Sequence, residues 1–182
     1  MPTRRPDPDS LRKPRVLILV DESNVTSTAK VTNRKLDWLK LRDHLVSGRE
    51  LLEMVVYVGL PPAMSEWQAE RDKKNKFVFW LRSNGFLVMS KDGSPADESH
   101  YKANVDVLMA IDGVELSTQM QPDVVTLVTG DADFAELALR LRRRGIRVEV
   151  ASVAHTLGAG LKTSANAIID LGPLLASFDS LA

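Results

Sequence analysis

The sequence contains no cysteine among its 182 residues. This absence excludes a disulfide framework, a thiolate metal site and a cysteine nucleophile, so a reducing cytoplasm is the expected location. Long hydrophobic runs are also missing. The aliphatic runs, such as VLILV at residues 16–20, are far shorter than the ~20 apolar residues of a membrane helix. The basic residues at the start are followed by no apolar stretch, so neither a signal peptide nor a membrane span is expected.

Net charge is absent as well, since 24 basic residues balance 24 acidic ones. The overall charge therefore gives no indication of a polyanionic partner. Basic residues nevertheless gather in the first fifteen positions, near residues 71–76 and at residues 140–147. Such runs are often solvated helix faces, but they also permit local basic patches. Four prolines and few large apolar groups predict a flexible basic arm over residues 1–14, followed by a single domain over residues 15–182.

Five short apolar runs alternate with helix-like segments along the chain. The runs cover residues 15–21, 51–59, 85–90, 123–131 and 146–152, and a sixth short strand is expected at residues 167–170. Continuous apolar runs are typical of strands that are buried on both faces of a parallel sheet. Helices are expected around residues 36–45, 67–81, 102–116 and 134–144, with a mobile loop at residues 91–101. The alternation predicts an α/β fold, a Rossmann-like three-layer α/β/α sandwich with a mostly parallel sheet of five to six strands.

Carboxylates stand near the ends of two of these runs. Asp21 ends the first run, Asp131 and Asp133 follow the fourth, and Asp106 lies one turn inside the helix that leads to the fourth. Ligands of open parallel sheets bind at the carboxyl edge where the strand order reverses, so the four carboxylates converge if the first and fourth strands are neighbours. Each also has a plainer interpretation. Asp131 could cap a helix, Asp21 could belong to a turn, and Asp106 could face solvent.

Four converging carboxylates would raise each other's pKa unless a cation compensates their charge. A ligand set made only of carboxylate oxygens favours Mg²⁺ or Mn²⁺ over zinc. Because Mg²⁺ usually binds through one or two carboxylates together with a substrate phosphate, a phosphodiester is the expected substrate. The expected reaction is metal-assisted hydrolysis of that phosphodiester.

Three blocks of the sequence resemble a known family. VLILVDESNV, YKANVDVLMAIDGVEL and VVTLVTGDADFAELALRLRRRGIRVEV are similar to the signature blocks of the NYN domain, LabA-like branch, within the PIN-like nuclease superfamily. The resemblance implies a PIN-like fold and a Mg²⁺- or Mn²⁺-dependent ribonuclease. The catalytic and metal-binding residues that it implies are Asp21, Asp106, Asp131 and Asp133.

The same resemblance implies supporting residues. Asn24 and Thr129 would donate hydrogen bonds that hold the carboxylates, and Asp112 would either join the cluster or orient Lys102. One departure stands near the end of the chain, where Ala165 is followed by Asn166 and many relatives carry an Ala-Asp pair. RNA is the expected partner, and a homodimer is a further option. The residues expected to bind RNA phosphates are Lys30, Arg34, Lys35, Arg140 and Arg143.

Base recognition has weaker support, because aromatic residues are only 5% of the chain and more often fill a core. Tyr101 and Trp67 are the candidates for base stacking.

Three alternatives to a nuclease are open. The first is a non-catalytic RNA-binding or regulatory module of the LabA-like type. The second is a haloacid dehalogenase-like phosphatase with Asp21 as nucleophile, which needs an Asp where the chain has Ser23. The third is a phosphate-accepting receiver domain, which needs a lysine that VEVASVAH lacks.

Overall fold

The structure, a computed structural model, describes residues 12–181 and is built around a six-stranded sheet. All neighbouring strands of this sheet pair in parallel, in the order β3-β2-β1-β6-β7-β8. The strands are β1 (Arg15–Asp21), β2 (Glu50–Leu60), β3 (Leu87–Asp92), β6 (Val124–Val128), β7 (Arg147–Ser152) and β8 (Ala167–Asp170). The predicted fold class and the six predicted strands are therefore confirmed.

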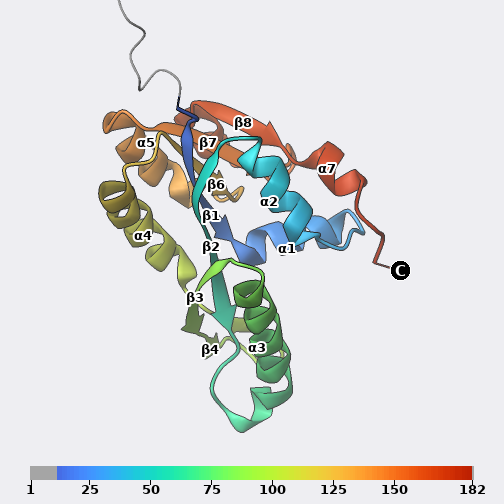
Figure 1. Ribbon diagram of the computed structural model, residues 1–182. Coiled ribbons are helices and arrows are strands. Elements are labelled where there is room, and N and C mark those ends of the chain that lie inside the picture. The colour runs from blue at the N-terminus through green and yellow to red at the C-terminus, as the bar shows by residue number, and fades with distance from the viewer. Residues whose placement is uncertain (1–11, 182) are drawn as a thin grey trace, which may run out of the picture.

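Helices cover both faces of the sheet, which makes the predicted three-layer sandwich (Figure 1). One face carries α1 (Glu22–Val31), α2 (Trp38–Val46), α3 (Gln68–Ser83) and α7 (Gly172–Ala176). The other carries α4 (Val105–Met120), α5 (Ala135–Arg143) and α6 (Ala159–Ser164). The short elements are the 3-10 turns η2 (Ser65–Trp67) and η3 (Ala132–Phe134) and the hairpin strands β4 (Ser94–Pro95) and β5 (Tyr101–Lys102). No described helix is long and apolar enough to cross a membrane.

The central strand β1 is apolar throughout because both of its faces are covered. Residues 16–20 are all completely buried. Ile18 packs into the core under α1 and α2, whereas Leu17 and Leu19 pack into the core under α4 and α5. Each fully buried aliphatic side chain contributes roughly 1.5–3 kcal/mol relative to an exposed one. The end of β1, where Asp21 lies, is therefore firmly fixed in space.

The strand order reverses between β1 and β6. These two strands pair directly, and Val20 lies opposite Val128 at the end of the ladder. The residues that follow, Asp21 and Thr129, emerge side by side at the carboxyl edge of the sheet. The first and fourth expected strands are thus neighbours, which is the condition for the carboxylates to converge, and their adjacency creates the crevice in which sheets of this kind bind ligands.

Helix α1 was not expected from the sequence. Its apolar residues at helical spacing are mainly Val25 and Ala29, which are one turn apart and both buried. The remaining positions are largely polar or β-branched, so the pattern is weak. The helix starts where the side chain of Asp21 accepts a hydrogen bond from the backbone nitrogen of Asn24.

Two boundaries also differ from the prediction. The helix expected over residues 102–116 begins at Val105, and Lys102 lies in β5, so Asp106 stands in the first turn of α4 and not one turn inside it. Residues 91–101 end β3 and enter a short hairpin where a continuous loop was expected. Tyr101 fixes this hairpin, because its hydroxyl donates to the Gly59 carbonyl at 3.3 Å.

Most of the predicted N-terminal arm, residues 1–11, lies outside the described residues. Arg12 donates two hydrogen bonds to the carboxylate of Asp123, at 2.7 and 3.0 Å. The division into an arm and a single domain stays a prediction.

Candidate metal centre

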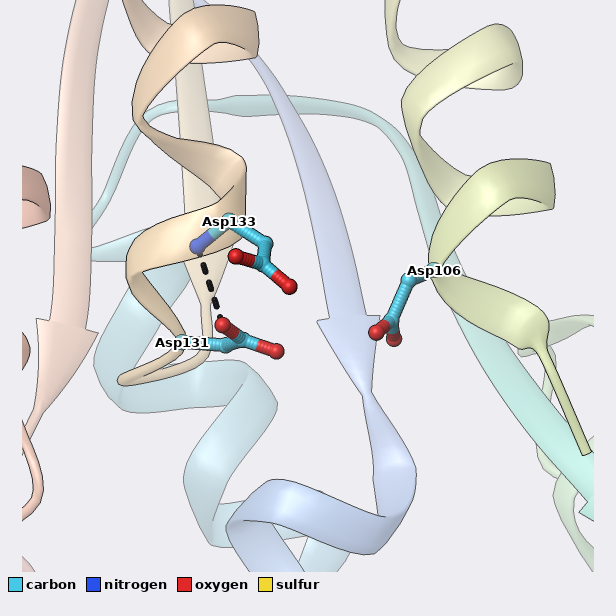
Figure 2. A group of neighbouring side chains, drawn as sticks. All are labelled: Asp106, Asp131 and Asp133. Atoms are coloured by element: carbon cyan, nitrogen blue, oxygen red, sulfur yellow. Dashed lines mark hydrogen bonds between the residues drawn. The ribbon is translucent and has the colours of Figure 1, made fainter. Parts of the chain in front are cut away.

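Three carboxylates meet at the carboxyl edge of the sheet. Asp106 comes from the first turn of α4, whereas Asp131 and Asp133 come from the loop and 3-10 turn after β6. One oxygen of each lies within 4.8 Å of the other two. Figure 2 shows the side chain of Asp106 pointing from its helix toward the two others. These three residues are called the acidic cluster below.

The charges of the acidic cluster disfavour the ionised form of Asp106. Burial raises the pKa of Asp106, and the negative charges of Asp131 and Asp133 raise it further. Lys102 opposes this change, because its positive charge lowers the pKa of Asp106. Three carboxylate oxygens with no nitrogen or sulfur ligand among them suit a hard divalent cation such as Mg²⁺ or Mn²⁺. The residues present therefore fit the metal that the sequence implied.

Asp131 acts as a cap and leaves an oxygen free. Its Oδ1 accepts a hydrogen bond from the backbone nitrogen of Asp133 at 2.9 Å, which starts η3. Within residues 12–181, no donor is bonded to its other oxygen, Oδ2. In Figure 2 one oxygen meets the dashed bond and the other points away from it. The capping interpretation and the metal interpretation of Asp131 are therefore compatible, because each needs a different oxygen.

Asp21 lies beside the acidic cluster at the end of β1 and is only 4% exposed. Its carboxylate accepts hydrogen bonds from the hydroxyl groups of Thr129 at 3.1 Å and Ser23 at 3.3 Å. Burial raises its pKa to about 6, the charge of Asp106 adds to the increase, and the hydrogen bonds oppose it. Asp21 is not a member of the three-oxygen group. The structure thus joins three of the four predicted carboxylates and places the fourth within electrostatic reach of Asp106.

Thr129 and Asn24 connect the ends of β1 and β6. The Thr129 hydroxyl donates to Asp21 Oδ2 at 3.1 Å and accepts from the backbone nitrogen of Asp131, also at 3.1 Å. Asn24 Oδ1 accepts from the backbone nitrogen of Gly130 at 2.9 Å. These bonds hold the loop that carries Asp131 against the start of α1.

The same loop is held from its other side. Gly158 donates its backbone nitrogen to the Gly130 carbonyl at 2.9 Å. A Cβ at Gly130 would collide with the Thr156 carbonyl oxygen and would press on the Ser152 hydroxyl. Glycine is therefore required at position 130 because of this close approach. Asp131 and Asp133 therefore follow a loop that has little room to move.

We expect Thr129→Val to weaken both the fold and the metal site. The variant leaves the Asp131 nitrogen without its acceptor and Asp21 without a buried donor, which costs roughly 1–3 kcal/mol. Loss of a group that orients metal ligands lowers metal affinity by roughly 10–100-fold. Urea unfolding in a chelator measures the first effect, and calorimetric titration with Mn²⁺ measures the second. Thr129→Ser retains the hydroxyl and should behave like the wild type. Wild-type Mn²⁺ affinity in Thr129→Val would contradict this role.

Asp112 points elsewhere. It lies farther along α4, where its charge acts on Tyr57 of β2. The Tyr57 hydroxyl is buried and has no hydrogen-bond partner among the described residues. Burial raises the pKa of Tyr57 above its usual range, and the charge of Asp112 raises it further. The structure therefore places Lys102 at the acidic cluster but places Asp112 outside the three-oxygen group.

The residues predicted to bind RNA fall into two groups. The first group lies at the end of α1 and just after it, and lines one cavity on the side of α1 and α3. It consists of Lys30, Arg34 and Lys35. Arg140 lies on α5 and is paired with Glu136 at 3.1 Å. Arg143 ends α5, which leads away from η3, and it lines a different hollow at the start of β7. The structure therefore does not bring the five predicted residues together.

Glu22 is a residue of this region that the sequence interpretation missed. It is buried, accepts a bond from Lys74 Nζ at 2.8 Å, and accepts another from the Thr26 hydroxyl at 3.3 Å. Its charge raises the pKa of Tyr101, although burial of Tyr101 is the larger cause. Glu22 directly follows Asp21 in the sequence, and this position could have indicated it. It was missed because helix α1, which contains it, was not expected.

The departure at Asn166 lies far from the acidic cluster. Asn166 Oδ1 accepts from the backbone nitrogen of Val148 at 2.8 Å, near the start of β7. The acidic cluster lies at the opposite, carboxyl edge of the sheet. Asparagine at this position consequently serves to join β7 to the segment before β8.

The chain is similar to a known protein family and to a solved structure. The profile of the NYN domain family matches residues 15–172. A crystal structure of a protein of unknown function from Vibrio parahaemolyticus RIMD 2210633 is similar, with a TM-score of 0.71 and 24% sequence identity. The similarity covers 88% of this chain and 94% of that chain. At this identity it shows the fold alone, and it supports a PIN-like fold. A search of curated proteins found no significant match.

Proposed function

Because the chain belongs to the NYN domain family, within the PIN-like nuclease superfamily, we propose that it is a Mg²⁺- or Mn²⁺-dependent ribonuclease. The single observation that carries the proposal is the convergence of Asp106, Asp131 and Asp133, whose oxygens lie within 4.8 Å of one another at the switch point of the sheet. This donor set suits a hard cation, and such cations in turn bind phosphate oxygens.

The side chains take distinct roles in this proposal. Asp106, Asp131 and Asp133 hold the cation, and Asp21 adds a fourth negative charge from the end of β1. Thr129 keeps Asp21 and the Asp131 loop in register. When bound, the cation would lower the pKa of an attacking water and offset the charge on the phosphodiester.

Within the family, we propose that the chain belongs to the LabA-like branch, on the basis of the TGDADF and NVDV blocks. RNA is the proposed substrate, because NYN nucleases act on RNA. The cytoplasmic location and the homodimer stay predictions.

Cleavage of a labelled RNA tests the proposal. A 5′-labelled RNA that contains a hairpin and single-stranded tails is incubated with MnCl₂, with MgCl₂, or with EDTA. We expect cleavage with either cation and none with EDTA, and the product lengths separate internal from terminal cleavage. Intact RNA under all three conditions would contradict a nuclease, and cleavage that persists in EDTA would contradict a metal-dependent one.

A further inference from the structure

A cavity of about 470 Å³ opens on the side of α1 and α3. Leu36, Trp38, Phe77 and Tyr101 supply much of its wall. The rings of Trp38 and Phe77 lie 5.7 Å apart at 51°. Cavities that bind small organic groups usually measure roughly 300–1,000 Å³ and are mostly apolar. This space, called the aromatic cavity below, therefore has the size and the lining to receive a planar organic ring.

The rim of the aromatic cavity is positively charged. Lys30, Lys35 and Lys73 line it, and no ion pair or hydrogen bond engages their ammonium groups within residues 12–181. Lys74 also lines the cavity, but its charge is matched by Glu22 at 2.8 Å. Glu70 is the remaining acidic residue of the lining. An apolar interior with a surplus of free lysines at the rim is complementary to an organic ring that is joined to anionic groups.

The aromatic cavity continues toward the acidic cluster. A second cavity of about 350 Å³ shares Glu22, Lys74 and Tyr101 with it. The same second cavity is lined by Lys102 and Val105, and Val105 directly precedes Asp106 in α4. Lys102, whose charge acts on Asp106, thus lines a cavity that shares its wall with the aromatic cavity.

We propose that the aromatic cavity receives a nucleobase of a single-stranded RNA, while the lysines at its rim bind the flanking phosphates. The inference rests on the proposed function, because it concerns the strand whose phosphodiester lies at the acidic cluster. Stacking of bases on aromatic side chains beside a basic groove is how proteins hold single strands without reading their sequence. A base inside a duplex is stacked and paired and therefore cannot enter, so the site selects unpaired RNA. A peptide or a second copy of this chain would not need the continuity with a phosphodiester site.

Binding of an eight-nucleotide RNA and of an abasic chain of the same length tests the inference. Both chains carry a fluorescent label, and anisotropy is measured in EDTA so that no cleavage occurs. The two ligands share phosphates and differ only in bases. Base stacking corresponds to roughly a 5- to 150-fold difference in Kd. We expect wild-type protein to bind the ordinary RNA more tightly than the abasic chain by a factor in this range.

Two pairs of variants on α3 locate the effect. Phe77→Leu should remove most of the preference for bases, whereas Phe79→Leu should leave it unchanged, because Phe79 is 73% exposed and does not line the cavity. Lys73→Glu should weaken binding of both chains, whereas Lys76→Glu, which alters the same helix outside the cavity, should weaken it less. Thermal unfolding of each variant confirms that the comparison is made between folded proteins.

The outcomes separate this inference from the proposed function. RNA cleavage with equal Kd values for the two chains overturns the inference alone, as does an equal effect of Phe77→Leu and Phe79→Leu. A base preference that depends on Phe77, without cleavage in Mn²⁺ or Mg²⁺, overturns the proposed hydrolysis and leaves the base site. If neither chain binds and Phe77→Leu converts a dimer to a monomer in sedimentation, the occupant is a second copy and the inference is overturned.

Discussion

Replacing Asp131 with asparagine is expected to abolish divalent-cation-dependent RNA cleavage. The substitution removes one negative charge from the acidic cluster but keeps an oxygen that can accept from the Asp133 nitrogen, so η3 should survive. Loss of groups that merely orient metal ligands already costs roughly 10–100-fold. We therefore expect at least a ~100-fold loss of the cleavage rate from the removal of a ligand itself. The rate is measured at saturating MnCl₂ on the labelled RNA.

Asp170→Asn is the matched control for this experiment. Asp170 also stands at the carboxyl end of a strand, β8, and its Oδ1 accepts from the Gly172 nitrogen at 2.9 Å. It is exposed and lies outside the acidic cluster. Its substitution should leave cleavage unchanged. Equal activity of Asp131→Asn and Asp170→Asn would refute the assignment of the metal site.

The second large effect concerns Asp21, whose removal should stabilise the metal-free protein while it impairs cleavage. Burial and the charge of Asp106 raise the pKa of Asp21 from 3.8 to about 6 in the folded chain. Between these two values the folded state binds more protons than the unfolded state, so stability falls as the pH rises through the window and stays low above it. At ~1.4 kcal/mol for each unit of pKa, the change amounts to about 2–3 kcal/mol.

Asp21→Asn removes this charge and keeps an oxygen that can accept from Thr129. In a chelator at pH 7 the variant should therefore unfold at a higher urea concentration than the wild type, by about 2 kcal/mol. The wild type should become less stable as the pH rises from about 4 to about 6, and the variant should not show this decrease. Saturating Mn²⁺ should reduce this difference, because a cation at ~100 times its Kd stabilises the wild type by about 2.7 kcal/mol, whereas the variant lacks the fourth negative charge and binds the cation more weakly.

Asp37→Asn controls for the helix cap. Asp37 caps α2 as Asp21 caps α1, since its side chain accepts from the Lys40 nitrogen at 3.0 Å, but it lies outside the acidic cluster. Its substitution should produce no stabilisation at pH 7 and no change in the response to Mn²⁺. If Asp21→Asn is less stable than the wild type in the chelator, the folded state does not disfavour the ionised form of Asp21, and the prediction is wrong.

The sheet and the meeting of Asp106, Asp131 and Asp133 could be predicted because both follow from the order of apolar runs and acidic residues along the sequence. Continuous apolar runs such as residues 16–20 occur where both faces of a strand are covered, and this requires a parallel sheet between two helical layers. The carboxyl ends of parallel strands then lie at one edge. Asp131 and Asp133 follow a strand that ends at this edge, and Asp106 lies in the first turn of the helix that begins there, so the three side chains meet.

The rest depends on contacts that leave no periodic signal. Helix α1 has few apolar positions, so its existence depends on the Asp21 cap and on Val25 and Ala29 packing into a core built by other segments. Glu22 is buried and pairs with Lys74 because it lies in the first turn of that helix. The direction of Asp112 depends on how α4 is rotated against β2.

The aromatic cavity was beyond sequence reasoning for a similar reason. Trp38 and Phe77 come from different helices, and their approach is set by packing on the sheet. Tyr101 and Trp67, which the sequence suggested for stacking on bases, pack on each other with ring centroids 5.4 Å apart. Tyr101 still reaches the wall of the cavity, whereas Trp67 is buried. Single-sequence patterns do not carry information on such pairs.

The most direct test of the account is the position of Mn²⁺ in crystals of the protein soaked in MnCl₂, located by anomalous scattering. The account predicts a peak among the carboxylates of Asp106, Asp131 and Asp133, with Asp21 beside it, and the loss of this peak in crystals of Asp131→Asn. An acidic cluster that holds no Mn²⁺ at a saturating concentration, or a peak that persists unchanged in the variant, would contradict the central claim.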